Sequence, residues 1–497
     1  MKTTAPTILI AGAGPTGLML ALELCRHGIL PRLVDALPGP SILSRALVVH
    51  ARTLELLDRH GLAEQFVARG EVVRGLGLRR GGQRVAMAPL GRFGEGISPF
   101  PFVLGISQDQ TETLLREALV TYGVPIEWNT ILTALTQDAA GVTATLQAPG
   151  QPPETVQTAY VAGCDGAHSA VRHALSIGFP GGTYEQLFFV ADTLVDGLRP
   201  HPQAGRLIEV ALAAHSFYAF FPMPQGRTRV IGLLPDDQVQ AAATFADVQP
   251  QLEQIEHLRV REVSWFSTYR VHHRVAEHFR QGRVLLVGDA GHVHSPVGGQ
   301  GMNTGLGDAV NLGWKLAAVL TGAAPAALLD TYEAERMPFA LQLVASTDRA
   351  FTVATRPTAW AGFVRSHLAP LLMPLVLRLP GVRRFMFRRL SQTAIAYPQS
   401  RLSRGRAAGV VGGMRLPWAP ERYEVLRRVG WQVLCVGAAP AALVAWAQAH
   451  GLPVTVLAVA AETPGTVYLV RPDAYVGLVA TAFRESEFSA YATQWGL

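Results

Sequence analysis

The stretch Gly12-Ala13-Gly14-Pro15-Thr16-Gly17 decides the fold because of what stands on either side of it. Before it, Thr7 to Ala11 is a short apolar run that predicts a strand, and after it Leu18 to Arg26 has the pattern of a helix. Pro31 to Val34 predicts a second strand, which ends at Asp35. Strand, GxGxxG, helix, strand and acidic end form the βαβ unit that binds the pyrophosphate of a nucleotide at a helix N-terminus.

Each residue of this unit has an expected role. The glycines allow the backbone to approach a phosphate closely, and Pro15 is tolerated in the first helical turn, where its missing N–H is no loss. Asp35 is placed to bond a ribose hydroxyl, and its charge repels a ribose 2′-phosphate, which favours FAD or NAD over NADP at this site. The residues expected to bind the nucleotide are Gly12, Gly14, Pro15, Thr16, Gly17 and Asp35.

A second glycine-rich stretch, GDAGHVHSPVGGQGMN, runs from Gly288 to Asn303. The apolar run Val284 to Val287 predicts a strand that enters it, and a helical pattern from about Met302 to Leu320 leaves it. Free N–H groups and the positive end of the helix dipole converge at such a helix start, so we expect it to hold an anionic or electron-rich ring. Pro296 has no N–H and a fixed φ, which suits a rigid wall beside that ring.

Three further positions are candidates for cofactor contact. The strand Tyr160 to Cys164 ends in Asp165-Gly166-Ala167-His168-Ser169-Ala170-Val171-Arg172, which predicts a turn and a helix start at the same edge of the sheet. Arg45 precedes a predicted helix and either clamps a phosphate, lies over a flavin edge or is simply an exposed loop residue. Gln108 begins another predicted helix and is either a cofactor contact or a plain polar helix start.

Short strands dominate from about Tyr184 to Tyr269 and predict an antiparallel sheet that is rich in aromatic residues. These residues form an ordinary core or, alternatively, line a pocket for a flat aromatic substrate. They are Phe188, Phe189, Phe217, Tyr218, Phe220, Phe221 and Trp265. Candidates for the base that activates a phenol are His215, Tyr218 and His292, each of which also has a plain structural reading. His292 and His294 lie too close together, without a third ligand, to suggest a metal.

The composition narrows the class of protein. The 497 residues suggest two or three domains, and 49% hydrophobic with 16% charged residues describe a well-buried globular protein. The net charge of +6 is spread along the chain, so nucleic-acid binding is not expected. Cys25, Cys164 and Cys435 lie far apart and offer no disulfide framework, which suits a reducing cytoplasm. No apolar window is long enough to span a membrane, and no signal peptide fits before the first strand.

Three motifs stand in order along the chain: Gly12 to Gly17, Asp165 to Arg172, and Gly288-Asp289 with the loop that follows. In this order and spacing they resemble the motifs of the single-component, class A flavoprotein aromatic monooxygenases, the group that includes p-hydroxybenzoate hydroxylase. The last hundred residues have a βαβ…β order like that of thioredoxin, although Cys435 has no partner cysteine. Together with Tyr468-Leu469-Val470-Arg471-Pro472-Asp473, this segment looks like the phenol and aromatic-polyketide hydroxylase branch.

The resemblance implies an α/β fold with a Rossmann-type FAD-binding domain, an inserted antiparallel-sheet substrate domain and a C-terminal thioredoxin-like domain. The implied boundaries are 1–72, 106–182 and 276–350 for the FAD-binding domain, 73–105 and 183–275 for the substrate domain, 351–398 for linker helices, and 399–497 for the thioredoxin-like domain.

By the same resemblance, FAD lies extended, with its ADP half at Gly12 to Gly17 and Asp289 on its ribityl chain. Arg45 and Gln108 fall where the family contacts FAD, and Asp165 and Arg172 mark a turn associated with both FAD and the reduced nicotinamide. The flavin is expected to rest against Pro296, Gly299, Gln300, Gly301, Met302 and Asn303. Gln300 stands where the best-known member has a lysine, so the local electrostatics differ.

The implied reaction uses NADPH or NADH to reduce the flavin, after which O₂ forms a flavin C4a-hydroperoxide that hydroxylates a phenolic or polycyclic aromatic ring. Only one strand–GxGxxG–helix unit is visible, so the nicotinamide is expected to bind transiently. The alternatives are Baeyer–Villiger oxygen insertion into a polycyclic ketone and a flavin-binding protein without catalysis. A halogenase is disfavoured because neither Lys2 nor Lys315 is placed to capture hypohalite. A homodimer is left open.

Overall fold

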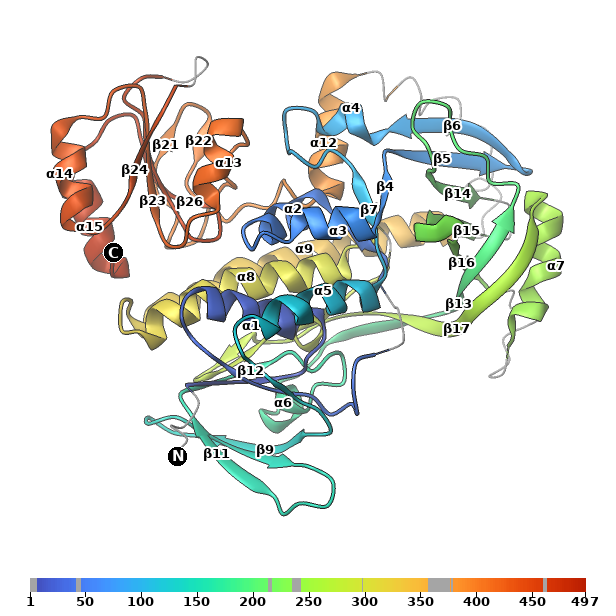
Figure 1. The fold of residues 1–497 in the computed structure, drawn as a ribbon, viewed down its shortest axis with the longest axis horizontal. Helices are drawn as coiled ribbons and strands as arrows, with labels where there is room; N and C mark the ends of the chain where they lie inside the picture. The colour runs from blue at the N-terminus through green and yellow to red at the C-terminus, as the bar shows by residue number, and fades with distance from the viewer. Residues whose placement is uncertain are drawn as a thin grey trace.

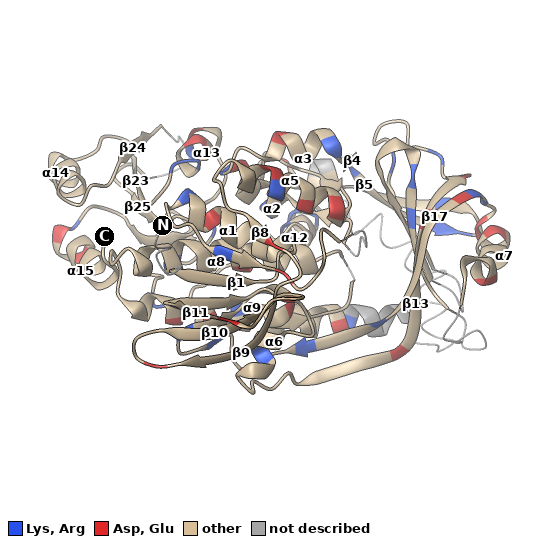
Figure 2. Cartoon of the chain, turned by 60° about the horizontal axis from the view of Figure 1, so that its bottom comes forward, with Lys and Arg blue, Asp and Glu red and all other residues tan. Residues whose placement is uncertain are grey.

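The computed structural model places three bodies around two long helices, α8 (Gly301–Leu320) and α9 (Asp330–Thr355) (Figure 1). The structure describes residues 7–41, 46–212, 217–234, 243–296, 298–355, 376, 379–458 and 463–497. Lys and Arg are interspersed with Asp and Glu along the helices and strands (Figure 2). Among the described helices, none combines the length and the apolar character that crossing a membrane requires.

The first body is built on a six-stranded sheet with the order β18-β19-β12-β1-β2-β8. Its strands are β1 (Ile8–Ala11), β2 (Arg32–Val34), β8 (Ile126–Glu127), β12 (Tyr160–Gly163), β18 (Arg280–Gln281) and β19 (Val284–Leu286). All neighbouring pairs are parallel except β18 with β19. Because β1, β12 and β19 lie side by side and point the same way, the three motifs that follow them meet at one edge of the sheet.

Helices α1 (Pro15–Arg26) and α8 pack against each other beside this sheet. The inner strands β1, β12 and β19 are buried along their whole length, as strands covered on both faces of a parallel sheet are expected to be. The predicted strand–glycine turn–helix–strand unit is therefore confirmed, and the helix predicted from Met302 begins at Gly301. Helix α5 (Gln108–Val120) also packs against α1.

The second body is an eight-stranded sheet with the order β20-β17-β13-β16-β15-β14-β5-β6. Its strands are β5 (Gly75–Arg80), β6 (Gln83–Pro89), β13 (Gly181–Asp196), β14 (Ile208–Leu212), β15 (Phe217–Pro222), β16 (Thr228–Leu233), β17 (Arg259–Val275) and β20 (His292–Val293). The long antiparallel pair β13 and β17 runs from the first body to the far side of this sheet (Figure 1). Helix α7 (Phe245–Glu256) covers one face of the sheet.

Alternation along the strands divides the predicted aromatic residues between the two faces of this sheet. Phe189, Tyr218 and Phe220 are buried in the core beneath α7. Phe188 packs on the opposite face with the partly buried Phe217. Only this second face is available to line a pocket, because α7 seals the first.

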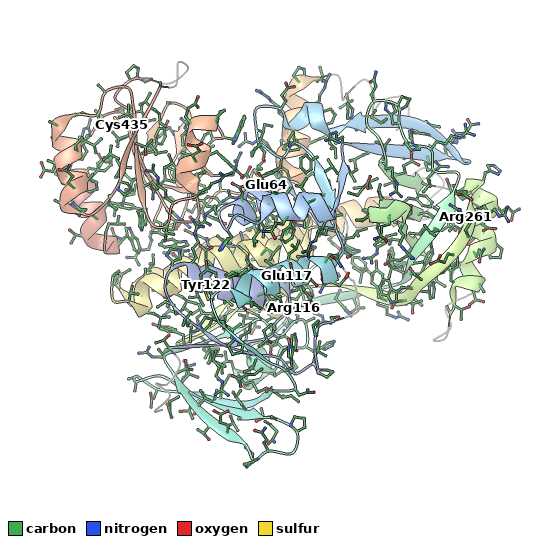
Figure 3. All side chains as sticks on the ribbon, in the orientation of Figure 1. Glu64, Arg116, Glu117, Tyr122, Arg261 and Cys435 are labelled. Atoms are coloured by element: carbon green, nitrogen blue, oxygen red, sulfur yellow. The ribbon has the colours of Figure 1, made fainter. Side chains whose placement is uncertain are left out.

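The third body is formed by the C-terminal part of the chain, here called the C-terminal segment. Its four-stranded sheet has the order β24-β23-β25-β26, with β23 parallel to β24 and antiparallel to β25. The elements that build it are α13 (Pro420–Leu426), β23 (Gln432–Val436), α14 (Ala441–Ala449), β24 (Val454–Leu457), β25 (Val467–Val470), β26 (Val476–Ala480) and α15 (Glu485–Trp495). This is the predicted order, and Cys435 lies buried within its sheet as a free thiol (Figure 3).

The connection between the first and third bodies is described only in part. Helix α9 extends to Thr355, and α12 (Pro380–Leu390) precedes the C-terminal segment, whereas residues 356–375 and 377–378 of the predicted linker lie outside the described residues. Phe387 of α12 is buried against α4 (Leu90–Gly94), so this basic helix packs on the body of the protein. The division of the chain at the boundaries given above stays a proposal.

Candidate active site

A cavity of about 700 Å³ lies at the edge of the six-stranded sheet where the three motifs meet. Its walls come from the turns after β1, β12 and β19, from the start of α8, and from the open face of the eight-stranded sheet. Of the predicted site residues, those that line it are Gly12, Gly14, Pro15, Thr16, Asp35, Gln108, Asp165, Asp289, Pro296, Gly299, Gln300, Gly301 and Met302. One continuous space thus connects the nucleotide-binding turn, Gly12 to Gly17, with the glycine-rich stretch from Gly288 to Asn303, where the flavin is expected.

The three glycines of the first motif serve different purposes. A Cβ atom on Gly12 would lie 2.3 Å from the carbonyl oxygen of Cys164, and one on Gly17 would lie 1.9 Å from the carbonyl oxygen of Gly12. These two glycines permit the close packing of strand, turn and helix. Gly14 has no atom within 4 Å of its Cβ position and lines the cavity, so its missing side chain leaves room for a ligand at the N-terminus of α1.

Asp35 is held rigidly at the nucleotide end of the cavity. Its Oδ2 atom accepts a hydrogen bond from the backbone N–H of Ala13 at 2.6 Å, and its Oδ1 atom accepts one from Leu37 at 2.8 Å. A carboxylate oxygen has further lone pairs, so both can still accept from a ribose hydroxyl. Gln108 also lines the cavity, where its Oε1 atom accepts from the N–H of Ala46 at 3.2 Å. Arg45 lies outside the described residues.

The turn after β12 presents Asp165 to the cavity but turns Arg172 away from it. The Oδ2 atom of Asp165 accepts from the N–H of Val171 at 3.1 Å, while its Oδ1 atom is buried without a hydrogen-bond partner. Burial raises the pKa of this carboxyl, against the hydrogen bonds that it accepts. Arg172 does not line the cavity and instead donates to the carbonyl oxygens of Ala290 and Ala167, each at 2.9 Å, which ties this turn to the next one.

The segment from Gly288 to Asn303, here called the flavin loop, is fixed from behind by Asn303. The Oδ1 atom of Asn303 accepts hydrogen bonds from the backbone N–H of His50 at 2.8 Å and from the hydroxyl of Thr53 at 2.7 Å. Its Nδ2 atom donates to the carbonyl oxygens of Val48 and Gly299, each at 2.8 Å. Asn303 does not line the cavity, so its observed role is to hold the loop and the start of α8 in place.

The two histidines of the flavin loop have opposite surroundings. His292 faces away from the cavity and lies with its Nε2 atom 2.6 Å from the Oδ2 atom of Asp308. His294 lines the cavity, where its Nδ1 atom lies 2.8 Å from the carbonyl oxygen of Ser295 and its Nε2 atom is buried without a partner. Burial lowers the pKa of His294 to about 4, so near neutral pH its Nδ1–H donates to Ser295 and its Nε2 atom is a free acceptor.

At its far end the cavity reaches Phe221, Arg229 and Ile231 on the open face of the eight-stranded sheet. Arg229 is buried and donates from Nε and Nη2 to the two carboxylate oxygens of Asp192, at 2.7 and 2.8 Å. Its Nη1 atom is buried without a hydrogen-bond partner, and its guanidinium carbon lies 5.3 Å from the centre of the Trp265 ring. The paired carboxylate therefore orients a cation whose third nitrogen is left for a ligand.

The remaining candidates for a substrate base do not meet at this cavity. Tyr218 is buried beneath α7, where its hydroxyl lies 3.5 Å from the Gln251 Oε1 atom and burial raises its pKa to about 12. His215 lies outside the described residues. Arg229 was not identified from the sequence. It is the single charged residue in the mostly apolar strand Thr228 to Leu233, and that isolated charge could have marked it as a candidate.

These observations fit FAD as the resident cofactor. The same cavity is lined by Asp35 at one end and by Gly301 at the start of α8. At Gly14 the missing side chain leaves open space for a ligand. The cavity also holds buried polar atoms without a protein partner on Asp165 and His294. Buried polar groups are normally hydrogen-bonded, so these two atoms, which line the cavity, are available to a ligand that fills it.

Comparison with known proteins identifies the family of the chain. The FAD binding domain family matches residues 5–347. The 12-dehydrotetracycline 5-monooxygenase/anhydrotetracycline 6-monooxygenase of Streptomyces rimosus subsp. rimosus is 38% identical over 402 residues, which cover 79% of this chain and 77% of that protein. A flavin-dependent monooxygenase of Mycobacteroides abscessus is 33% identical over 499 residues, covering 96% of this chain and 98% of that protein.

The solved structure of an anhydrotetracycline hydroxylase from Streptomyces rimosus superposes with a TM-score of 0.78 at 32% sequence identity and covers 99% of both chains. A solved aromatic hydroxylase from angucycline biosynthesis gives a TM-score of 0.79 at 29% identity, again over 99% of both chains. The chain therefore belongs to the FAD binding domain family and is one of its FAD-dependent aromatic monooxygenases.

Proposed function

We propose that this monooxygenase hydroxylates a flat, polycyclic phenol or quinone, with NADH or NADPH as the electron donor and O₂ as the oxidant. One oxygen atom enters the ring and the other leaves as water, so that NAD(P)H, H⁺, O₂ and the substrate give NAD(P)⁺, H₂O and the hydroxylated product. FAD, when bound, supplies the chemistry that accepts the hydride and activates O₂. The observation that carries the proposal is the continuous cavity from the glycine turn to Arg229.

The residues at the start of α8 suit the flavin end of the cofactor. The N–H groups of Gly301, Met302 and Asn303 lie in the first turn of a 20-residue helix, where no acceptor within the helix is available. With the positive end of the helix dipole, they favour negative charge in this part of the cavity. Pro296 closes one wall without offering a donor, and His294 offers a single neutral acceptor.

The substrate end combines one cation with an apolar wall. Arg229 can donate from its unpaired Nη1 atom to a phenolate or carbonyl oxygen, which orients the ring and stabilises negative charge on that oxygen. Phe221 and Ile231 flank it in the cavity, and the same sheet face continues into Phe188, Phe217 and Tyr269. The apolar side chains keep water from the reacting atoms, and an apolar face that continues beyond Phe221 and Ile231 favours a substrate of several fused rings over a single ring.

The relatives favour the same class of substrate. The names of the two Streptomyces rimosus proteins refer to anhydrotetracycline, and another relative that is 36% identical over 346 residues is a pentachlorophenol 4-monooxygenase from Sphingobium chlorophenolicum. We infer from the aromatic sheet face that this chain acts on the polycyclic side of that range.

The test is NADH and NADPH oxidation by the purified, FAD-loaded protein with naphthoquinones, anthraquinones, tetracyclic phenols and simple phenols. The proposal expects oxidation stimulated by polycyclic compounds and one ¹⁸O atom from ¹⁸O₂ in a hydroxylated product. An ester or lactone product would instead establish Baeyer–Villiger insertion. Bound FAD without stimulation by any aromatic compound would contradict the proposal and favour a flavin-binding protein without catalysis. A homodimer stays a prediction, which light scattering tests.

A further inference from the structure

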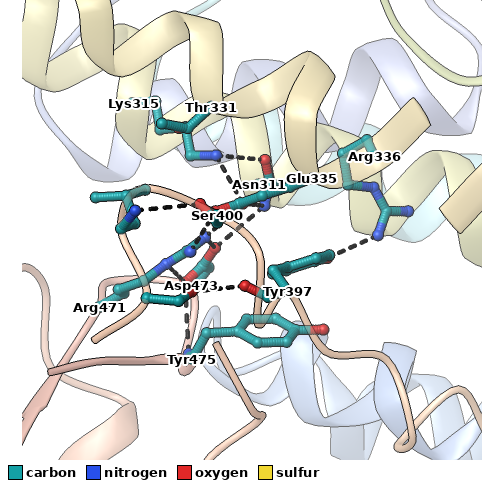
Figure 4. A network of polar contacts seen from close by, with 12 residues as sticks. Asn311, Lys315, Thr331, Glu335, Arg336, Tyr397, Ser400, Arg471, Asp473 and Tyr475 are labelled. Atoms are coloured by element: carbon teal, nitrogen blue, oxygen red, sulfur yellow. Dashed lines mark hydrogen bonds and ion pairs between the residues drawn. The ribbon is translucent and has the colours of Figure 1, made fainter. Parts of the chain in front are cut away.

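The C-terminal segment joins the rest of the protein through a buried group of charged residues (Figure 4). Arg471, directly after β25, donates from Nη1 and Nη2 to the two carboxylate oxygens of Glu335 on α9, at 2.6 and 2.9 Å. It also donates from Nε to the Oδ1 atom of Asp473 at 3.0 Å, and its Nη2 atom contacts Oδ2 of the same carboxylate. The Oε2 atom of Glu335 accepts in turn from the Lys315 ammonium of α8, at 2.8 Å.

This group is balanced and shielded from water. Its two cations and two carboxylates are all buried, with Lys315, Arg471 and Glu335 at 2% exposure or less. Burial would raise the pKa of Glu335, but the charges of Arg471 and Lys315 outweigh it and hold that pKa well below its usual range. Burial lowers the pKa of Lys315 to about 8 despite its contact with Glu335. Removing one member leaves a buried charge without its partner, which is costly.

A first route leads from this group to the flavin loop through the next residue of α9. Arg336 donates from Nε to the Oδ1 atom of Asp308 and from Nη2 to the carbonyl oxygen of Thr304, at 3.1 Å, in the first turns of α8. The Oδ2 atom of Asp308 then accepts from the N–H of Gly288 at 3.2 Å and contacts His292. The start of the flavin loop, and Thr304 directly after its end, are thus bound to Arg336 of α9 or to the carboxylate that Arg336 holds.

A second route leads through α2 (Ala51–Asp58). The carbonyl oxygen of Asp473 accepts from the Nη2 atom of Arg52 at 2.8 Å, and Arg52 also contacts Glu55, to which Arg415 of the C-terminal segment donates. The neighbouring Thr53 donates to Asn303, the residue that clamps the flavin loop. The two routes start at Arg471 and Asp473 and reach the same loop, the first at Gly288 and His292 and the second at Asn303.

We propose that Arg471 and Asp473 are positioning residues for FAD, which fix the flavin loop through α9 and α2, so that the C-terminal segment is part of the flavin site. The inference rests on the placement of the flavin ring at this loop and is independent of the substrate. Both residues act through other groups, since neither lines the cavity. The binding and orientation of FAD then depend on Arg471 and Asp473, which follow the flavin loop by more than a hundred residues in the sequence.

The experiment uses the full chain with Arg471→Met, which keeps the length of the side chain but removes its charge and hydrogen bonds. FAD affinity is measured by quenching of flavin fluorescence, and the asymmetry of the ring environment by visible circular dichroism. We expect FAD to bind about tenfold more weakly, with an altered visible spectrum. Arg427→Met is the matched control, because Arg427 also joins the C-terminal segment to α2, through Asp58 at 2.7 Å, yet its side chain is 56% exposed and Asp58 takes part in neither route.

A purely structural role gives a different result. If Arg471→Met lowers the melting temperature but leaves the FAD affinity within twofold of the wild type and the dichroism unchanged, the proposal is overturned. Should Arg471→Met fail to fold, Arg471→Lys retains a charge but not the fork that holds both carboxylates, and it is expected to weaken FAD binding to a lesser degree. Unchanged FAD affinity and dichroism in Arg471→Lys would then overturn the proposal.

A double variant tests the first route directly. If Arg471 acts on FAD through Asp308, the Arg471→Met/Asp308→Asn variant binds FAD no more weakly than the weaker of the two single variants. Independent effects that multiply would contradict this route. These readouts do not require a substrate, so they stand even if no aromatic compound stimulates NAD(P)H oxidation.

Discussion

The Nε2 atom of His292 lies 2.6 Å from the Oδ2 atom of Asp308, and this contact points the imidazole away from the cavity. The same carboxylate is held by Arg336 and receives the N–H of Gly288. Burial would raise the pKa of Asp308, but the charge of Arg336 and the hydrogen bond with His292 keep it lowered. His292, a candidate base by sequence, is therefore placed as a support for the flavin loop, whereas His294, two residues later, faces the cavity.

Substituting His292 by Gln is expected to lower the free energy of unfolding by about 2 kcal/mol, because the buried Asp308 loses a close hydrogen-bond partner. Urea unfolding in the presence of FAD measures this loss. His278→Gln is the control. The His278 side chain is 64% exposed and its Nδ1 atom lies 3.7 Å from the Oε1 atom of Glu333, an exposed contact that contributes less than about 1 kcal/mol. A His292→Gln variant that keeps its stability but shows a shifted pH dependence of kcat would restore His292 as a catalytic base.

Gly14 and Gly17 are expected to respond differently to substitution by alanine. Gly17→Ala places a methyl group 1.9 Å from the Gly12 carbonyl oxygen, which costs about 2 kcal/mol or more of stability even without FAD. Gly14→Ala meets no protein atom within 4 Å, so the apoprotein keeps its melting temperature while FAD binding weakens by about tenfold, or 1.4 kcal/mol. Melting of the apoproteins and FAD titration measure the two effects. Equal FAD affinity in Gly14→Ala and the wild type would argue against a cofactor phosphate at this turn.

Arg229→Lys is expected to lower kcat/KM for a polycyclic phenol by roughly 10- to 100-fold, because one hydrogen bond from a charged group contributes about 1.5–3 kcal/mol. A lysine ammonium cannot donate to both Asp192 oxygens in a fork and also reach the ligand. The FAD affinity should change by less than twofold. Steady-state kinetics with FAD titration check this, and a loss confined to FAD binding would place Arg229 at the cofactor instead of the substrate.

The acid side of the stability profile is expected to depend on His50. Burial lowers the pKa of His50 to about 4, although its Nε2 atom lies 2.8 Å from the carbonyl oxygen of Gly298. The folded state binds fewer protons than the unfolded state between the folded pKa of about 4 and the ordinary value of 6.5, so stability falls as the pH falls through this window. His50→Gln retains a donor for Gly298 but cannot titrate.

Melting temperatures between pH 6.5 and 4.5 therefore fall less steeply in His50→Gln than in the wild type. Glu335 and Asp308 have lowered pKa values, and their contribution is lost only as the pH falls below the ordinary range of a carboxyl near 4.5. Their titration therefore contributes little within this window, and Asp165, whose pKa is raised by burial, is common to both proteins, so the difference between the two melting curves reports on His50. Parallel melting curves for the two proteins would show that His50 is not buried in its neutral form.

Much of the site followed from local pattern. The turns after three apolar strands were recognisable because parallel strands expose their carboxyl ends at one edge, and most of the predicted cofactor residues line the cavity. Arg172 and Asn303 do not, because the side chains of such turns also hold neighbouring turns together. Nothing in the spacing of residues distinguishes a side chain that faces the ligand from one that faces the scaffold.

The amino-acid sequence by itself determined the nucleotide unit, the order of the three motifs and the helix start at the flavin loop, since glycine turns and apolar periodicity act over a few residues. Only the tertiary structure decided which aromatic face stays open, because that depends on where α7 packs. It also decided that Arg229 meets Asp192 across two strands and that Arg471 meets Glu335 across 136 positions of the chain. Buried charges find their partners through the packing of distant elements, and local sequence patterns carry no record of that packing.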